Sequence, residues 1–271
     1  MRNERKIWLG MLLCLSLQWP LSVVRAQLPE KYDLLWEKPI PSKGLYADKL
    51  LQPYTISPDN AFKKWSPEGL ELGHFANPAL GRLASADVSD PFNVLLFYPD
   101  YQTILLLDRT LNPLTELRLS PDDFPHPVAA AMTRNNQIVV YDDATYRLKQ
   151  VNQLGQITAE SQDLSQIDAP PQAPVTMVAG EEGIFLADTA SGIWVFDRLG
   201  QYQFTLPITG VDFLQLFDRY LIYRRKGEYF IRPTENRLRL HMSLPEPSTL
   251  AFFQKNRLYL YHNQVLKAYA F

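Results

Sequence analysis

The sequence has 271 residues, of which 27 are Lys or Arg and 29 are Asp or Glu, so the formal net charge is −2. This balance argues against nucleic acid and against an anionic membrane surface as partners, because both attract an excess of positive charge. A single cysteine, Cys14, excludes an intramolecular disulfide, and the length is ample for one large hydrophobic core.

The N-terminus has the parts of a secretory signal peptide. A basic run at residues 1–6 precedes an apolar stretch at residues 7–24, and Val24 and Ala26 occupy the −3 and −1 positions before a cut at Gln27. A membrane anchor is the rival interpretation, because a spanning helix needs about 20 apolar residues. Pro20 interrupts the stretch, however, and no cationic run follows it. We therefore predict a signal peptide at 1–26 and a single exported domain at 27–271.

Cleavage changes the charge and the cysteine content of the chain. The removed segment contains four basic residues and one acidic residue, which leaves 23 against 28 and a net charge of −5. Cys14 lies in that segment and follows Leu13, whereas a lipid-attached cysteine follows a small residue. We expect no lipid anchor and, because the mature chain lacks cysteine, we expect a domain that depends on its core alone, in the periplasm of a bacterium.

From residue 45 onward, short runs rich in Val, Ile, Tyr and Phe recur between turn residues, which is typical of many short strands. The plainest unit, 184–207, contains three such runs and two turns. In successive units the turn before the third run ends at Gly69, Pro113, Gly155, Gly200 and Asn236. These positions are 36 to 45 residues apart. A period near forty with three or four strands indicates propeller blades.

A further apolar run precedes each later unit and would be its inner strand. These runs are 83–88, 128–132, 175–179, 211–216 and 249–253. The sixth unit has only two more runs, at 257–262 and 265–271, whereas the run 32–38 has no unit of its own. We predict an all-β, six-bladed β-propeller whose last blade is closed by the N-terminal strand, because an open ring would leave unpaired sheet edges. A β-sandwich is the alternative, which the regular spacing disfavours.

Two segments resemble known proteins. The segment 188–200 (DTASGIWVFDRLG) resembles an NHL-type repeat, in which an Asp, a small-residue turn, an apolar strand, an Asp and a Gly follow one another. Asp108 keeps the second acidic position in another unit. Three units depart from it, with Ser66, Asn152 and Pro233. The resemblance implies a six-bladed propeller and little about chemistry.

The segment 86–104 (ADVSDPFNVLLFYPDYQTI) is similar to a run in uncharacterised exported proteins of Bacteroidota. That resemblance implies a periplasmic accessory subunit of an outer-membrane machine. A plug-like subunit of the type 9 secretion translocon is one candidate.

The predicted inner strands carry few groups suited to catalysis. Asp87 and Asp212 are their only acidic residues, whereas calcium takes six to eight oxygen ligands. The four histidines, at positions 74, 126, 241 and 262, do not pair at metal-ligand spacing. No nucleophile elbow or phosphate loop occurs. We predict no catalytic residue, no metal and no cofactor. The alternative is a lactonase-like or sugar-processing enzyme, which would need several polar side chains in the central channel.

Acidic residues end several predicted strands and could bind ions or fix turns. They are Asp108, Asp142, Asp188 and Asp197. A carboxylate beside a tight turn accepts hydrogen bonds from backbone N–H groups, so we interpret them as turn-fixing residues. Aromatic residues at equivalent strand positions are expected to pack between blades. They are Tyr98, Tyr141, Trp194, Phe196 and Tyr261.

Three connections between units are long and rich in proline, at 120–127, 163–174 and 244–247. In a propeller they share one face with the turns between second and third strands. Because proline stiffens a loop and lowers its ordering cost on docking, we predict a partner-binding surface on this face. Its predicted residues are Asp100, Tyr101, Asp122, Asp123, Phe124, Asp142 and Asp143, with Arg224 and Arg225 as a basic exception.

Phe124 and Tyr101 are the predicted aromatic anchors of this surface. The expected partner is another cell-envelope protein, with the propeller peripheral to the membrane at most. Simple solvation of each polar loop is the alternative interpretation. A carbohydrate or peptide binder that uses the channel mouth is a further alternative.

Overall fold

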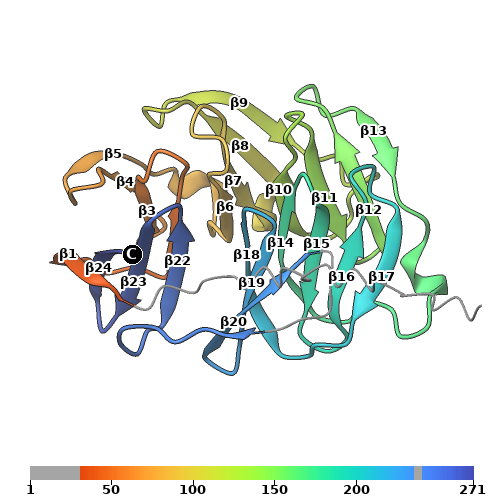
Figure 1. The fold of residues 1–271 in the computed structure, drawn as a ribbon. Coiled ribbons are helices and arrows are strands. Elements are labelled where there is room, and N and C mark those ends of the chain that lie inside the picture. The colour runs from red at the N-terminus through yellow and green to blue at the C-terminus, as the bar shows by residue number, and fades with distance from the viewer. Residues whose placement is uncertain (1–30, 235–239) are drawn as a thin grey trace, which may run out of the picture.

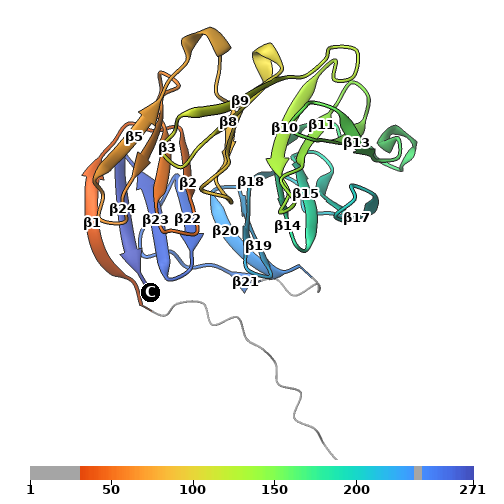
Figure 2. The same cartoon turned by 90° about the horizontal axis from the view of Figure 1, so that it is seen from above.

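The computed structural model describes residues 31–234 and 240–271, which form six four-stranded antiparallel sheets around a common centre (Figures 1 and 2). Each sheet is one blade of a propeller. Five blades add their strands from the centre outward in chain order, and the sixth combines both ends of the described chain. The predicted all-β, six-bladed architecture is confirmed. The predicted signal peptide at 1–26 lies outside the described residues.

The first three blades come from the N-terminal half of the chain. Blade 1 contains β2 (Gly44–Ala47), β3 (Pro53–Ile56), β4 (Phe62–Trp65) and β5 (Glu71–Phe75). Blade 2 contains β6 (Ser85–Asp87), β7 (Val94–Tyr98), β8 (Thr103–Leu107) and β9 (Pro113–Arg118). Blade 3 contains β10 (Pro127–Met132), β11 (Ile138–Asp142), β12 (Arg147–Val151) and β13 (Ile157–Glu160). The short 3-10 turns are η1 (Pro78–Leu80), η2 (Pro99–Tyr101) and η3 (Leu164–Gln166).

The other three blades complete the ring. Blade 4 contains β14 (Pro174–Gly180), β15 (Gly183–Asp188), β16 (Gly192–Phe196) and β17 (Tyr202–Leu206). Blade 5 contains β18 (Val211–Phe217), β19 (Tyr220–Arg225), β20 (Glu228–Pro233) and β21 (Leu240–His241). Blade 6 contains β22 (Leu250–Gln254), β23 (Arg257–His262), β24 (Val265–Ala270) and, as its outer strand, β1 (Asp33–Pro39).

Strand β1 closes the ring, as predicted. It pairs antiparallel with β24 and so gives blade 6 its fourth strand. It also reaches blade 1, because the Trp36 indole Nε1 donates to the carbonyl of Pro67 at 2.7 Å and Lys38 Nζ donates to the carbonyl of Gly69 at 2.9 Å. Gly69 has a φ of +84°, and a Cβ there would meet the Trp36 ring at 3.0 Å. The turn therefore needs glycine both for its conformation and for this contact.

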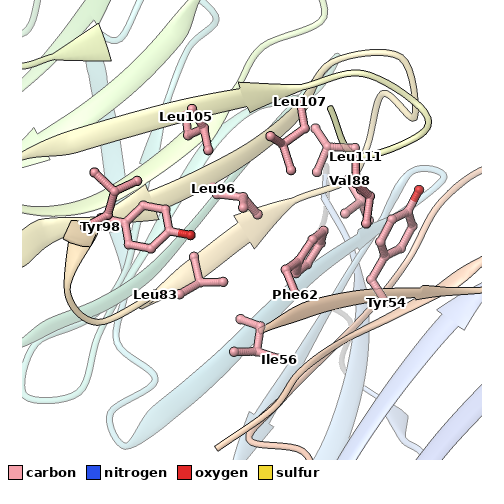
Figure 3. Packing of buried hydrophobic residues seen from close by; sticks show 12 residues of the cluster. Tyr54, Ile56, Phe62, Leu83, Val88, Leu96, Tyr98, Leu105, Leu107 and Leu111 are labelled. Carbon is pink, nitrogen blue, oxygen red and sulfur yellow. The ribbon is translucent and has the colours of Figure 1, made fainter. Parts of the chain in front are cut away.

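The core fills the spaces between blades, because the middle strands are buried on both faces. Every residue of β7 is buried. Val94, Leu96 and Tyr98 face blade 1, whereas Leu95 and Phe97 face blade 3. This alternation is the period of two that a strand imposes on its side chains. Figure 3 shows the first of these interfaces, in which side chains from β7 and β8 meet those from β3 and β4.

One inner strand was not predicted. Blade 1 begins with β2, four residues that follow closely after β1, whereas the inner strands of the other five blades were all expected. Four residues with a single long aliphatic side chain, that of Leu45, give too short an apolar run to be recognised. In blade 5, part of the predicted outer strand at 237–244 lies outside the described residues, and the described part of it contains β21.

The ring has two faces. We call the face with the outer-to-inner connections and the turns between second and third strands the connection face. The other, the turn face, carries the remaining turns within blades. Strand β1 starts at the turn face and β24 ends there, so Tyr32 packs against Phe271 with ring centroids 5.8 Å apart.

Candidate functional site

The connection face brings five of the nine predicted partner-binding residues together on blades 2 and 3. Asp100 and Tyr101 lie in η2, between the second and third strands of blade 2, and the Tyr101 side chain is 63% exposed. Asp122 and Asp123 are exposed on the connection from β9 to β10, and Asp143 is half-buried just after β11. We call this set of five residues the acidic rim.

Phe124 does not belong to the exposed surface. Its ring is 1% exposed and lies in the core cluster between blades 2 and 3. Its N–H donates to the carbonyl of Ser120 at 2.8 Å, a turn that directs the ring inward, and the Gln102 amide donates to the Phe124 carbonyl at 2.9 Å. Lys149 Nζ lies 5.1 Å from the ring centroid. The prediction that Phe124 is an exposed anchor is therefore wrong.

Asp142 is also unavailable to a partner, because its carboxylate is fully buried. It accepts hydrogen bonds from the N–H groups of His126, at 2.6 Å, and Thr145, at 2.8 Å. Asp100 makes the equivalent contact in blade 2, where it accepts from the N–H of Arg82 at 2.9 Å. Each carboxylate ties the connection that enters a blade to a turn of the same blade. The turn-fixing interpretation is confirmed for Asp142, and its prediction as a partner contact is wrong.

Arg224 and Arg225 lie on β19 in blade 5, far from the acidic rim around the ring. The Arg224 guanidinium pairs with Asp212, with Nε 2.8 Å from Oδ1, and it also donates to the carbonyl of Thr249. Burial alone would lower the pKa of Arg224, but Asp212 and Tyr229 raise it. Because only 16% of its side chain is exposed, Arg224 serves mainly to join blades 5 and 6.

A groove beside the acidic rim was not predicted. It has a volume of about 570 Å³ and lies where the inner ends of blades 2, 3 and 4 meet. Its polar lining includes Arg82, Asp100, Gln102 and His126. The His126 ring, through Nδ1, lies 2.5 Å from Asp143. The sequence signal was the connection containing His126 between two prolines, but the neighbours of that histidine come from other turns.

The six inner strands surround a central channel of about 260 Å³. Among the described residues, Asp87 and Asp212 are the only acidic residues on these strands, as predicted. Asp87 accepts from the N–H of Ser89 at 2.9 Å and from the N–H of Met132, in blade 3, at 2.8 Å. The described residues contain no group of three side chains suited to hold a metal. Both channel carboxylates have partners within the protein, since Asp87 accepts from backbone N–H groups and Asp212 is paired with Arg224.

Lys43 and Tyr46 line the channel beside blade 1, and Arg82 lies close to Lys43 in the neighbouring groove. Burial and the nearby Arg82 lower the pKa of Lys43, which donates a hydrogen bond to the side chain of Asn60. Burial also raises the pKa of Tyr46 to about 12, so its hydroxyl is neutral at physiological pH.

Among the described residues, the structure contains no helix with the length and apolar character that a membrane span requires.

The closed ring of four-stranded sheets defines the chain as a six-bladed β-propeller. No protein-family model and no curated protein matches it. Among solved structures it is similar to a streptogramin B lyase, with 14% identity, a TM-score of 0.59 and coverage of 89% of this chain and 86% of that one.

Two other solved structures are similar. One is the Pan2 WD40 domain of Neurospora crassa, with 9% identity, a TM-score of 0.56 and coverage of 88% of this chain and 95% of that one. The other is BBS1N in complex with ARL6DN, with 13% identity, a TM-score of 0.54 and coverage of 88% and 96%. At these identities the similarity shows the propeller fold alone.

Proposed function

We propose that this protein is a non-enzymatic, exported propeller that binds another cell-envelope protein through the acidic rim. The observation that carries the proposal is the connection at 120–127. It presents two exposed carboxylates, Asp122 and Asp123, on a segment that the buried ring of Phe124 holds against blades 2 and 3. Within the described residues, neither carboxylate has a hydrogen-bond or ion-pair partner of its own.

Rigid presentation favours binding, because a loop that is already ordered loses little entropy on docking. The buried Phe124 thus has a role other than that of an anchor: it fixes the segment that carries the charges. Exposed carboxylates attract a partner with Lys or Arg on its surface, and they mainly raise the association rate. Tyr101 supplies an exposed ring at the edge of the same surface.

The proposed compartment is the periplasm, which the predicted signal peptide and the cysteine-free mature sequence support. The resemblance of 86–104 to exported proteins of Bacteroidota supports a role as an accessory subunit of an outer-membrane or secretion complex. A protein partner on a similar fold has a precedent in BBS1N, which was solved in complex with ARL6DN.

An enzyme acting in the channel is the competing proposal, and the similarity to a streptogramin B lyase gives it a structural precedent. Catalysis through a metal would need several convergent oxygen ligands. Asp87 bonds to backbone N–H groups and Asp212 to Arg224, so the described channel supports binding better than catalysis.

The test is photo-crosslinking in the native host, with a crosslinking residue at Asp122 or, as a control on the turn face, at Asn135. We expect one dominant envelope protein to be captured from Asp122 and not from Asn135. Capture should weaken as the ionic strength of the washes increases, because screening acts on exposed charges.

Charge reversal provides the matched variants. The pair Asp122→Lys and Asp123→Lys should reduce capture at least about fivefold, which corresponds to about 1 kcal/mol of lost attraction. The melting temperature should not change, because both side chains are exposed. The pair Glu181→Lys and Glu182→Lys makes the same charge change on the turn face and should leave capture intact. Equal capture by both pairs would show that the acidic rim is not the docking surface.

A further inference from the structure

The lining of the central channel is more apolar than polar. Alanine, valine, leucine and methionine side chains from the inner strands make up most of its lining, including Ala86, Ala130, Val175, Met177 and Leu216. Beside the apolar part of this lining, water finds few hydrogen-bond partners, and displacing such poorly bonded water with an apolar group is favourable. The volume of about 260 Å³ is somewhat smaller than the roughly 300–1,000 Å³ of sites for drug-sized ligands. The channel therefore suits a small, apolar occupant.

Three half-buried aromatic rings line one side of this channel. Phe213, Phe252 and Tyr46 come from the inner strands of blades 5, 6 and 1, which are neighbours in the ring. The centroids of Phe213 and Phe252 lie 6.2 Å apart at 81°, and those of Phe252 and Tyr46 lie 6.3 Å apart at 57°. Aromatic rings attract a further ring in the same edge-to-face or offset geometry. The channel is therefore suited to an aromatic occupant.

Two of the polar side chains that line the channel are already paired, which favours a neutral ligand. Asp212 is paired with Arg224. The side chain of Gln215 donates to the carbonyl of Phe253, and its oxygen accepts from the N–H of Phe253 at 3.1 Å. A charged ligand that packs against the aromatic rings would lose much of its hydration, and the only cation in the described lining, Lys43, donates to the side chain of Asn60.

The channel is open to the connection face. Strand β14 has a bulge between Pro174 and Thr176, and the bulged residue Val175 is 46% exposed. Val175 lines both the channel and the neighbouring groove, so the two cavities are adjacent there. Strand β10 has the equivalent bulge at Val128, which lines the groove and not the channel. Bulges of this kind redirect a side chain next to a site.

We propose that the central channel is a binding site for a neutral aromatic ring of the size of a phenol or an indole. The ring enters past Val175 and packs against Phe252 and its two aromatic neighbours. The same chemistry is offered by a free small molecule and by an aromatic side chain of a docked protein. This site does not depend on the acidic rim, and its test requires no partner.

The test uses the purified propeller with indole and p-cresol as probes, measured by calorimetry and by saturation-transfer NMR. We expect saturable binding with a Kd of about 0.1–1 mM, as is reasonable for ligands of this size. Cyclohexylmethanol, a flexible aliphatic control, should bind at least about fivefold more weakly, because it lacks the ring quadrupole. Benzylamine should bind more weakly than indole, because Asp212 is paired with Arg224 and Asp87 already accepts from two backbone N–H groups.

Two variants locate the site. Val175→Phe fills the mouth of the channel and should weaken indole binding at least tenfold, whereas Val128→Phe, at the equivalent bulge outside the channel, should leave it unchanged. Phe252→Leu keeps an apolar side chain and removes the ring, and should weaken binding severalfold. Melting temperatures near that of the unaltered protein show that each variant is folded. Absence of indole binding, or equal binding by the two valine variants, would overturn the proposal.

A competition experiment identifies the source of the ring. If indole at a saturating concentration reduces capture of the partner, an aromatic side chain of that partner occupies the channel. If capture is unchanged while indole still binds, the occupant is a free small molecule. If no partner is captured from Asp122 but indole still binds, the proposal for the acidic rim fails and the proposal for the channel stands.

Discussion

The carboxylate of Asp188 accepts four backbone hydrogen bonds. One oxygen accepts from the N–H groups of Ala190 and Ser191, at 2.9 and 2.7 Å, and the other accepts from those of Gln172 and Ala173, both at 2.6 Å. The side chain is fully buried. A single residue thus fixes the turn after β15 and the connection that enters blade 4.

Replacing Asp188 with Ala should lower the free energy of unfolding by about 3 kcal/mol or more, because several buried N–H groups would lose their acceptor. Urea denaturation of the purified domain measures the change. Asp197→Ala is the matched control: Asp197 also accepts from two N–H groups, but at a turn near the surface, and its loss should cost about 1 kcal/mol or less. Equal losses would show that burial of the carboxylate is unimportant.

Asp48 should make stability depend on pH in an unusual direction. Burial raises the pKa of this carboxyl, although it accepts from the N–H groups of Leu50 and Gln52 and from the Tyr54 hydroxyl. A raised pKa means that the folded state holds the proton more tightly than the unfolded state. The contribution of Asp48 is therefore greatest below the unfolded pKa of about 3.9, and it is lost as the pH rises through the folded value.

Asp48→Asn removes this titration. The stability of the variant minus that of the unaltered protein should thus increase with pH from about pH 4 upward. Asp59→Asn should show the opposite slope, because a hydrogen bond from Ser57 lowers the pKa of the Asp59 carboxyl. Urea denaturation between about pH 3.5 and pH 7 tests both variants. Parallel profiles for Asp48→Asn and the unaltered protein would contradict the prediction.

Single residues differ in how far their roles follow from sequence. The roles of Asp142 and Asp188 follow from it, because an acidic residue beside a tight turn bonds to the nearest backbone groups. The burial of Phe124 does not follow, because its environment includes Lys149 from β12 and Gln102 from the turn after η2. A phenylalanine between acidic residues and prolines is apolar and lies in a loop, and only the surrounding fold decides whether it points inward.

At the scale of elements, β1 was predictable because the ring needs it. The sixth unit lacked an outer strand and the N-terminal run lacked a unit, so closure followed from counting strands. The partners of β1 in blade 1 could not be predicted. The contacts of Trp36 and Lys38 with the turn at Pro67 and Gly69 depend on the angle between neighbouring blades, which no local pattern reports.

Deleting residues 32–39 should lower the melting temperature by more than about 10 °C, because the edge of β24 and the inter-blade contacts of Trp36 would be lost. Differential scanning calorimetry measures the shift. A synthetic peptide of residues 31–40 should restore part of the loss, and the same peptide with Trp36→Ala should restore less. An unchanged melting temperature in the deletion variant would contradict closure by β1.

At the scale of the whole molecule, the start of β1 and the end of β24 lie side by side in blade 6. Tyr32 packs against Tyr269 and Phe271, with ring centroids 6.4 and 5.8 Å away. A ring held together by such neighbours has no structural need for its opening to lie at that point. The connections on the connection face are surface segments where the chain could equally well be opened.

A circular permutant should therefore fold. It would join residue 271 to residue 31 through a short Gly-Ser linker and open the chain between Ala169 and Pro170, in the connection before blade 4. We expect a melting temperature within about 5 °C of the unaltered protein and the same circular dichroism spectrum. A permutant opened within β15, whose residues are all buried, should fail to fold. Loss of folding in both would show that the order of synthesis matters to the ring.

Because blade 6 combines β1 with the last three strands of the chain, its strands cannot all pair until late in synthesis. Strand β1 is made early, yet its partner β24 ends at Ala270. While the chain is being synthesised, β1 has no strand to pair with, and its backbone edge remains unpaired until about 230 further residues have emerged. During that interval the chain is vulnerable to proteases and to pairing with other copies, so the demand for a chaperone should be set by the rate of emergence rather than by the stability of the finished ring.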